Sequence, residues 1–371
     1  MVHRPNSPTD GSIPAINKMY PQAVEIQQNI SLAPYTTFGI GGPARHFCAV
    51  TNEKDLLAAL RFAEKQELPH FVLGGGSNLL VSDEWYEGVV LHMQIMGVTA
   101  YPHSSAVLYD VGAGEDWDTF VRRTVEDNCA GIECLAGIPG TVGGTPVQNV
   151  GAYGQEVAET IASVRAYDTE AEDFVELQAK DCGFHYRQSL FNTTAVGRYI
   201  VTRVRFALHP GTLPQLKYAD LQKRFPVGGP TPSLIEVYDA VRSIRQAKGM
   251  LLVEDEPDCR SAGSFFKNPV VPGSMVARIA TALGIAADAV PRYPAGEGRV
   301  KIPAAWLLEQ AGFHKGFTMG RVGISSRHTL ALINRGGAMA MEIYALRDEI
   351  VSTISERFGI QLRQEPVELR G

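Results

Sequence analysis

The sequence has no long apolar run, no dense basic block and no paired cysteine motif. No stretch approaches the roughly 18 consecutive apolar residues of a membrane span, so none is predicted. Lys+Arg 34 against Asp+Glu 40 give a net charge of -6, which argues against a nucleic-acid partner. The five cysteines contain no C-x-x-C pair, which excludes a disulfide framework and a zinc site and favours a reducing, cytoplasmic location.

The standard nucleotide and hydrolase motifs are also missing. No G-K dipeptide occurs, which excludes a Walker A loop. Gly74 and Gly76 begin a G-x-G-x-x-G pattern, but Leu79 stands at the third glycine position and also breaks a G-x-S-x-G elbow around Ser77. No H-E-x-x-H cluster appears among the nine histidines, so no catalytic metal is expected.

What is present is a chain of 371 residues with 45% hydrophobic residues, enough for two or three packed domains. Helices and strands both recur along it. Helical spacing is found in residues 53–67, 117–124, 234–248, 303–310 and 339–358, and strand patterns in 70–73, 88–92, 107–111, 161–167, 174–177 and 199–208. Residues 1–19 have no such pattern and are expected to form a loose tail.

Glycine is the one unusual count, at 37 residues, and it clusters in two loops. Gly74-Gly75-Gly76-Ser77-Asn78 follows a strand, and residues 137–154 read GIPGTVGGTPVQNVGAYG. Backbone N–H groups in such loops can wrap an anion such as a pyrophosphate. The alternative is two surface connections that use glycine for turns. Because each loop also carries Ser or Asn donors, we favour the anion site.

Two further segments carry polar residues among apolar ones. Tyr186 and Arg187 lie in GFHYRQSLF, where a guanidinium could bind a substrate carboxylate or pair with a structural one. Ser264 lies in GSFFKNP, where a serine is more often a capping group than an acid. The residues alone leave both choices open.

The chain as a whole resembles a known family. NISLAPYTTFGIGG, LGGGSNLL, GIPGTVGGTPVQNVGAYG, FHYRQSLF, GSFFKNP, AAWLLEQAG and EPVELRG occur in the order found in the UDP-N-acetylenolpyruvoylglucosamine reductases, from about Asn29 to Gly371. LGGGSN alone is shared with other flavoproteins, whereas the combination of the longer motifs is specific. The resemblance implies an α+β protein with a two-subdomain FAD-binding fold of the vanillyl-alcohol oxidase and p-cresol methylhydroxylase type. A C-terminal α+β substrate-binding domain would follow.

That family reduces the enolpyruvyl ether of UDP-N-acetylglucosamine to UDP-N-acetylmuramate in peptidoglycan precursor synthesis, a cytoplasmic step. The resemblance implies FAD as cofactor, NADPH as hydride donor and a UDP-sugar as substrate. Reduced flavin would pass hydride to the enolpyruvyl methylene carbon, and a protein acid would protonate the neighbouring carbon. A monomer is expected, with neither nucleic acid nor membrane as partner.

Matching the family's motifs residue by residue implies specific roles. Ser264 would be the proton donor, Arg187 would bind the enolpyruvyl carboxylate and stabilise the enolate, and Glu365 would support protonation. Tyr218, in LKYADL, matches the tyrosine that covers the diphosphate arm in the tyrosine-loop subtype. The positions matched to FAD are Gly74, Gly75, Gly76, Ser77, Asn78, Gly140, Gly143, Gly144 and Gly151. Those matched to substrate or NADPH are Tyr186, Tyr218, Lys248, Asn268 and Gln310.

Some alternatives stay open. Glu368 rivals Glu365, which we prefer because Leu362 precedes it by three residues as in the family pattern; a solvated terminal carboxylate is the plainer reading of Glu365. A same-fold oxidase of a free sugar or alcohol, or a nucleotide-binding module without catalysis, would share the glycine loops. The expected division is a tail (1–19), FAD-binding subdomains 1 (20–95) and 2 (96–247), a substrate domain (248–360) and a C-terminal segment returning to the active site (361–371).

Overall fold

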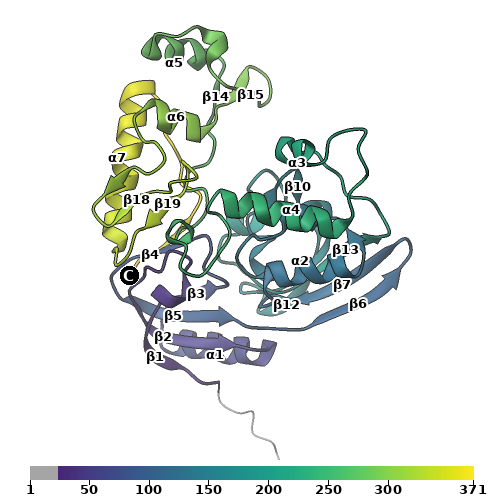
Figure 1. The fold of residues 1–371 in the computed structure, drawn as a ribbon. Coiled ribbons are helices and arrows are strands. Elements are labelled where there is room, and N and C mark those ends of the chain that lie inside the picture. Colours follow the sequence, from purple (N-terminus) through teal and green to yellow (C-terminus); the bar gives the residue numbers. More distant parts are fainter. Residues whose placement is uncertain (1–23) are drawn as a thin grey trace, which may run out of the picture.

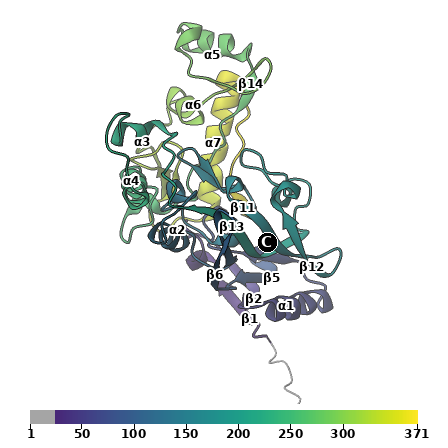
Figure 2. The same cartoon turned by 90° about the vertical axis from the view of Figure 1, so that its right-hand side faces the viewer.

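The computed structural model describes residues 24–371, so the expected tail and the start of the first subdomain lie outside the described residues. Figure 1 shows two sheet-containing units stacked below and to the right, and a third unit rising beside them. Figure 2 shows the same units after a quarter turn, with α7 running up through the third unit.

The first unit is a small sheet covered by one helix. Its strand order is β1-β2-β5-β3, with β1 antiparallel to β2 and the other pairs parallel. The helix α1 (Glu53–Lys65) lies in the predicted helical segment 53–67 and begins where Asn52 accepts hydrogen bonds from two backbone N–H groups. The strands are β1 (Gln27–Ser31), β2 (Pro43–Val50), β3 (His70–Leu73) and β5 (Tyr86–Met93).

The second unit is a larger antiparallel sheet in the order β12-β11-β13-β7-β6, with β8 pairing on β13. The predicted strands 161–167 and 174–177 form a hairpin, because β11 and β12 pair from Ser163 with Gln178 to Asp168 with Asp173. The strands are β6 (Val98–His103), β7 (Ala106–Gly112), β8 (Cys129–Ala130), β11 (Ile161–Asp168), β12 (Asp173–Gln178) and β13 (Tyr199–Pro210), and β9 (Gly151–Ala152) pairs with β10 (Gln155–Glu156) nearby.

Two helices cover this sheet. On α2 (Trp117–Glu126), in the predicted helical segment 117–124, Trp117 and Phe120 pack on Phe206 of β13. The helix α4 (Leu234–Ala247) lies in the predicted segment 234–248 and begins at a capping box, in which Ser233 and Glu236 bond reciprocally. A short helix, α3 (Ala219–Arg224), stands in the connection before α4, and the sequence did not predict it.

The third unit carries two small sheets and three helices. The predicted α6 (Ala304–Gln310) and α7 (Ala340–Phe358) are present, and α5 (Met275–Leu283) is a further helix that was not predicted. One sheet has the order β14-β16-β15 and the other β17-β18-β19. Their strands are β14 (Val270–Pro272), β15 (Tyr293–Pro294), β16 (Arg299–Lys301), β17 (Thr318–Met319), β18 (Val322–Ile324) and β19 (Leu332–Asn334).

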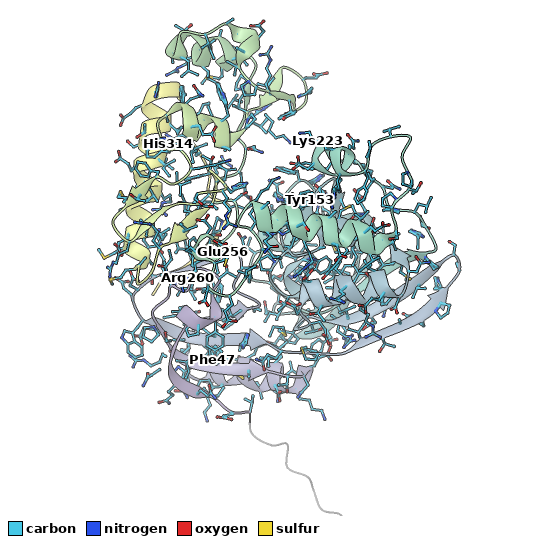
Figure 3. The ribbon with its side chains drawn as sticks, viewed as in Figure 1. Phe47, Tyr153, Lys223, Glu256, Arg260 and His314 are labelled. Atoms are coloured by element: carbon cyan, nitrogen blue, oxygen red, sulfur yellow. The ribbon has the colours of Figure 1, made fainter. Side chains whose placement is uncertain are left out.

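The C-terminal segment ties the third unit to the first. After α7, β20 (Val367–Leu369) pairs in parallel with β4 (Leu79–Val81), directly after the first glycine loop. Just before it, Glu365 N–H donates to Phe265 O, and Lys267 N–H donates to Arg363 O. The chain end therefore runs between the first glycine loop and the GSFFKNP segment. Near that segment, Glu256 and Arg260 lie where the third unit meets the others (Figure 3).

The buried cores also cross the expected boundaries. Phe38, Ile40 and Leu80, from the expected first subdomain, pack in the core of the third unit. Residues of α1 and β5 share one core with α2 and α4. In the described part of the chain, no helix combines the length and apolar character needed to cross a membrane.

Candidate active site

A cavity of about 1220 Å³ lies where the three units meet. Both glycine loops line it, together with Arg187, Ser264 and Glu365. Its volume exceeds the roughly 300–1,000 Å³ of ordinary small-molecule pockets. The cavity therefore has room for a cofactor and a second ligand at once.

The two glycine loops touch backbone to backbone at one end of this cavity. A Cβ on Gly75 would lie 2.7 Å from Gly140 Cα, and one on Gly74 would lie 2.7 Å from Thr141 Oγ1. Gly76 has φ +59°, where its Cβ would meet Tyr35 O at 1.9 Å. Glycine is thus required at these positions by packing. By contrast, a Cβ on Gly144 would meet nothing within 4 Å, so its side faces open space.

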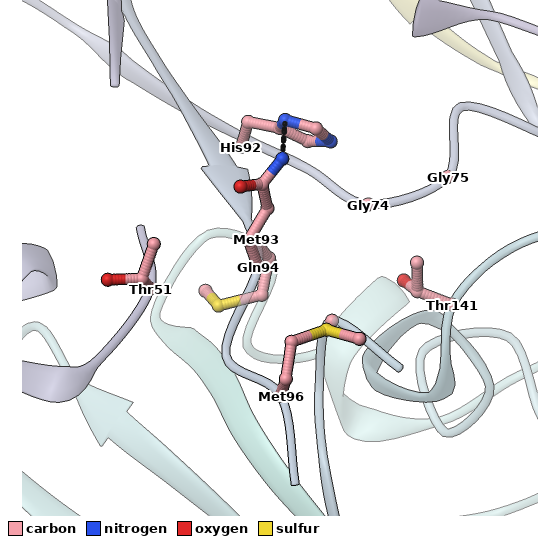
Figure 4. A pocket seen from close by; sticks show the side chains of 9 residues that line it. Thr51, Gly74, Gly75, His92, Met93, Gln94, Met96 and Thr141 are labelled. Carbon is pink, nitrogen blue, oxygen red and sulfur yellow. Dashed lines mark hydrogen bonds between the residues drawn. The ribbon is translucent and has the colours of Figure 1, made fainter. Parts of the chain in front are cut away.

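A second cavity, of about 630 Å³, continues along the first glycine loop and shares Gly74, Gly75, Met93 and Thr141 with the main cavity. Figure 4 shows the His92 ring beside the Gln94 amide, with His92 Nδ1 and Gln94 Nε2 3.1 Å apart, and Met96 a little further along the same segment. Glycine backbone on one side and apolar thioethers on the other suit an extended ligand with a phosphate centre and a flat ring at its end. FAD, the cofactor expected from the family resemblance, is a ligand of this kind.

Arg187 and Glu365 meet within the main cavity. Arg187 Nε lies 3.3 Å from Glu365 Oε1, and Arg187 Nη2 donates to Gly151 O at 2.7 Å. Arg187 has φ +56°, a left-handed conformation that is costly for a residue with a side chain. Gly151, expected among the FAD ligands, thus has its carbonyl occupied in holding the guanidinium.

Burial raises the pKa of Glu365, and the positive charges of Arg187 and Lys267 partly offset this effect. The side chain of Glu365 lines the cavity. Its position is fixed by the backbone, because Glu365 N–H donates to the carbonyl oxygen of Phe265, which follows Ser264 in the sequence. Glu368 has a different environment, since it pairs with Arg347 of α7 at 2.5 Å and with Arg370. Of the two rivals, only Glu365 lines the cavity.

The residues matched to the substrate are spread around the same cavity. Tyr186, Tyr218, Lys248 and Asn268 line it, whereas Gln310 is absent from its lining and stands at the end of α6. The Lys301 ammonium lies 4.8 Å above the Tyr186 ring. Asn268 Oδ1 accepts from Ala304 N–H at the start of α6.

Sequence reasoning missed several residues of the site. Lys267 lies in the GSFFKNP motif, and its positive charge lowers the pKa of Glu365. A lysine within this motif could have been identified as a site residue from the sequence. His328 belongs to no motif that would have marked it in the sequence. It lines the cavity, its Nδ1 accepts from Leu330 N–H, and burial together with Lys248, Lys315 and Arg245 lowers its pKa to about 4. Asn78 Nδ2 donates to Gln148 Oε1 at 2.7 Å and so joins the two glycine loops.

Comparison with known proteins agrees with this geometry. Residues 255–369 match the family model described as UDP-N-acetylenolpyruvoylglucosamine reductase, C-terminal domain, and residues 44–175 match an FAD binding domain. UDP-N-acetylenolpyruvoylglucosamine reductase from Thermobifida fusca is 45% identical over 92% of this chain and 97% of its own, and that from Pseudomonas putida is 39% identical over 92% and 98%. The crystal structure of the Thermus caldophilus reductase aligns with a TM-score of 0.62 at 26% identity, covering 93% of this chain and 99% of that one.

Proposed function

The chain belongs to the UDP-N-acetylenolpyruvoylglucosamine reductase family, and from this we propose a role for each residue that meets in the main cavity. The protein is an FAD-dependent reductase of the enolpyruvyl ether of UDP-N-acetylglucosamine, which serves peptidoglycan synthesis. One observation carries the proposed roles: Arg187, Ser264 and Glu365, from three distant segments, line one cavity with both glycine loops.

FAD would be held along the glycine loops by Gly74, Gly75, Gly76, Ser77, Asn78, Gly140, Gly143 and Gly144. Close backbone contact at Gly75 fixes the loops relative to one another, and Gly144 leaves open space for a ligand. When bound, FAD supplies hydride transfer from NADPH to the enol ether.

Arg187 binds the carboxylate of the enolpyruvyl group. Gly151 O and Glu365 engage one edge of its guanidinium, and further N–H groups remain for a substrate carboxylate. The positive charge then stabilises negative charge that develops on the substrate as its double bond is reduced. The strained φ of Arg187 supports a functional role, because such strain is retained where geometry matters.

Ser264 donates the proton to the substrate carbon beside the carboxylate. A serine hydroxyl is a weak acid, so the transfer needs positive charge nearby, which Arg187 and Lys267 supply. Glu365 holds Arg187 in place and supports reprotonation. Lys248, Asn268, Tyr186 and Tyr218 bind the UDP-sugar, with Lys248 at the diphosphate.

We also propose that the protein acts as a cytoplasmic monomer. One chain supplies all three catalytic candidates, so the site needs no partner residue. All five cysteines are buried free thiols, which suits a reducing compartment.

The test follows the two half-reactions without oxygen. Ser264→Ala should leave bleaching of the flavin by NADPH unchanged but slow its reoxidation by UDP-N-acetylglucosamine enolpyruvate by about 10²–10⁴-fold. Ser261→Ala is the matched control: Ser261 lines the same cavity, and its hydroxyl accepts Gly263 N–H. Unimpaired reoxidation in Ser264→Ala would remove Ser264 from its role. Wild-type flavin that oxygen reoxidises and the enol ether does not would favour the oxidase alternative.

A further inference from the structure

The ammonium of Lys248 is already paired with a carboxylate of this chain. Lys248 Nζ donates to Asp220 Oδ2 at 2.8 Å, and the two side chains are 34% and 32% exposed. Lys248 follows the end of α4, whereas Asp220 is the second residue of α3. The pair therefore joins two elements next to the lining of the main cavity.

Two tyrosine rings complete the surroundings of this ammonium. It lies 5.7 Å from the centre of the Tyr153 ring and 6.0 Å from that of Tyr218, and the two rings meet edge to face at 5.3 Å. Burial alone would lower the pKa of Lys248, but the Asp220 hydrogen bond and the two tyrosines outweigh it and raise that pKa. Lys248 is thus fully charged and held in one place.

Lys248 and Tyr218 line the cavity, whereas Asp220 lies outside its lining. A diphosphate that reached Lys248 from the cavity would meet an ammonium that a carboxylate already neutralises, and the two anions would repel each other at this distance. Either Asp220 leaves, or the diphosphate binds Lys248 less tightly than a free ammonium would allow.

We propose that Asp220 is a built-in competitor of the substrate diphosphate for Lys248. In the free enzyme it holds α3, and with it the Tyr218 ring, against α4. The diphosphate displaces Asp220 and takes over Lys248, so substrate entry is coupled to loss of the ion pair that joins α3 to the end of α4. This inference rests on the proposed function, which places the diphosphate at Lys248.

The anchoring of α3 agrees with such an exchange. Leu221 is fully buried in the core of the second unit, so the helix stays attached when the Asp220 contact is lost. The residues beyond it lead into a long connection in which Val227 is fully exposed, and this connection can accommodate a shift of Asp220.

The experiment measures binding of UDP-N-acetylmuramate to the oxidised holoenzyme by calorimetry. Asp220→Asn should bind it about three- to fivefold more tightly than the wild type, a gain typical of freeing a partly exposed ion pair. Lys248→Met should bind it more weakly, and adding Asp220→Asn to Lys248→Met should change nothing further. Asp239→Asn, which removes an exposed carboxylate from α4, is the control for net charge.

The outcomes distinguish the competitor role of Asp220 from the proposed binding of the diphosphate at Lys248. Weaker or unchanged binding in Asp220→Asn, with Lys248→Met still impaired, overturns the competitor role and keeps the diphosphate at Lys248. Weaker binding that Asp220→Glu restores would make Asp220 a positioning residue instead. If Lys248→Met binds as the wild type does, the proposed diphosphate site fails, and the competitor role fails with it. Thermal midpoints of each variant check that α3 remains folded.

Discussion

Arg187 and Glu365 form an ion pair that only the folded chain can bring together. Arg187 Nε lies 3.3 Å from Glu365 Oε1, and the side chains are 22% and 15% exposed. One partner stands in a tight turn closed by the pairing of His185 with Gln188, and the other in the segment that returns along the first glycine loop. The pair therefore links the proposed substrate carboxylate site to the last residues of the chain.

Replacing Glu365 should separate the two half-reactions. Glu365→Gln removes the charge that holds Arg187, so reoxidation of the flavin by the enol ether should slow by about 10²-fold or more, while bleaching by NADPH should be unchanged. Anaerobic stopped-flow absorbance measures both steps.

Glu368→Gln is the matched control, because Glu368 pairs with Arg347 outside the cavity. It should keep reoxidation within about twofold and instead lower stability by up to about 1 kcal/mol, as loss of a partly buried ion pair does. The reverse pattern would exchange the roles of the two glutamates.

The raised pKa of Glu365 sets a pH dependence. As the pH falls, Glu365 takes up a proton and its ion pair with Arg187 is lost. Because burial raises this pKa above its ordinary value of 4.5, reoxidation should begin to fall at a higher pH than an ordinary carboxyl would give. The pH profile of the reoxidation rate should show this acid limb, and Glu365→Gln should lack it. An identical limb in both proteins would assign it to another group.

His328 should make the stability of the folded protein depend on pH in the acidic range as well. Its pKa is about 4 in the folded protein against 6.5 for an ordinary histidine, so the unfolded chain takes up the proton first as the pH falls. The stabilisation is complete above pH 6.5 and is lost as the pH falls toward 4. At about pH 5 the loss amounts to roughly 2 kcal/mol.

Urea unfolding at about pH 7.5 and about pH 5 measures this effect. Wild type should lose roughly 2 kcal/mol more between the two conditions than His328→Gln, whose side chain does not titrate. Glutamine can still accept Leu330 N–H through its amide oxygen, so the comparison isolates the proton. Equal losses in both proteins would mean that His328 keeps an ordinary pKa.

Local pattern was enough to predict most of the helices and several of the long strands, but not the eight-residue strand β2. Asn52 and Ser233 mark the starts of α1 and α4, and apolar spacing fixes the buried faces. The pairing of β20 with β4 could not be predicted in this way, since three-residue strands far apart in sequence carry no periodic signal. The helix α3 has only six residues, too few for a recognisable face.

The choice between Glu365 and Glu368 shows what the sequence could not resolve. In an extended segment, side chains three positions apart point to opposite sides. Which side faces the cavity depends on how the C-terminal segment pairs with Phe265 and β4, and this is a tertiary property. The family pattern favoured Glu365, and the backbone pairing supplies the physical reason for its position.

Two glycines of the FAD loops should behave differently when changed to alanine. At Gly75 the new methyl would lie 2.7 Å from Gly140 Cα, so Gly75→Ala must push the loops apart. We expect it to lower the free energy of unfolding of the apoprotein by about 1–3 kcal/mol, the usual cost of overpacking. Flavin binding should weaken with it.

At Gly144 the methyl meets nothing within 4 Å, so Gly144→Ala should leave the stability of the apoprotein within about 0.5 kcal/mol. The methyl would project into the space that we assign to FAD, so the dissociation constant of FAD should rise by about tenfold or more. Titration of apoprotein with FAD, followed by quenching of flavin fluorescence, measures this constant. Because Gly144→Ala costs the free protein nothing, a loss of affinity reports contact with the cofactor itself. Unchanged affinity would place the bound FAD away from Gly144.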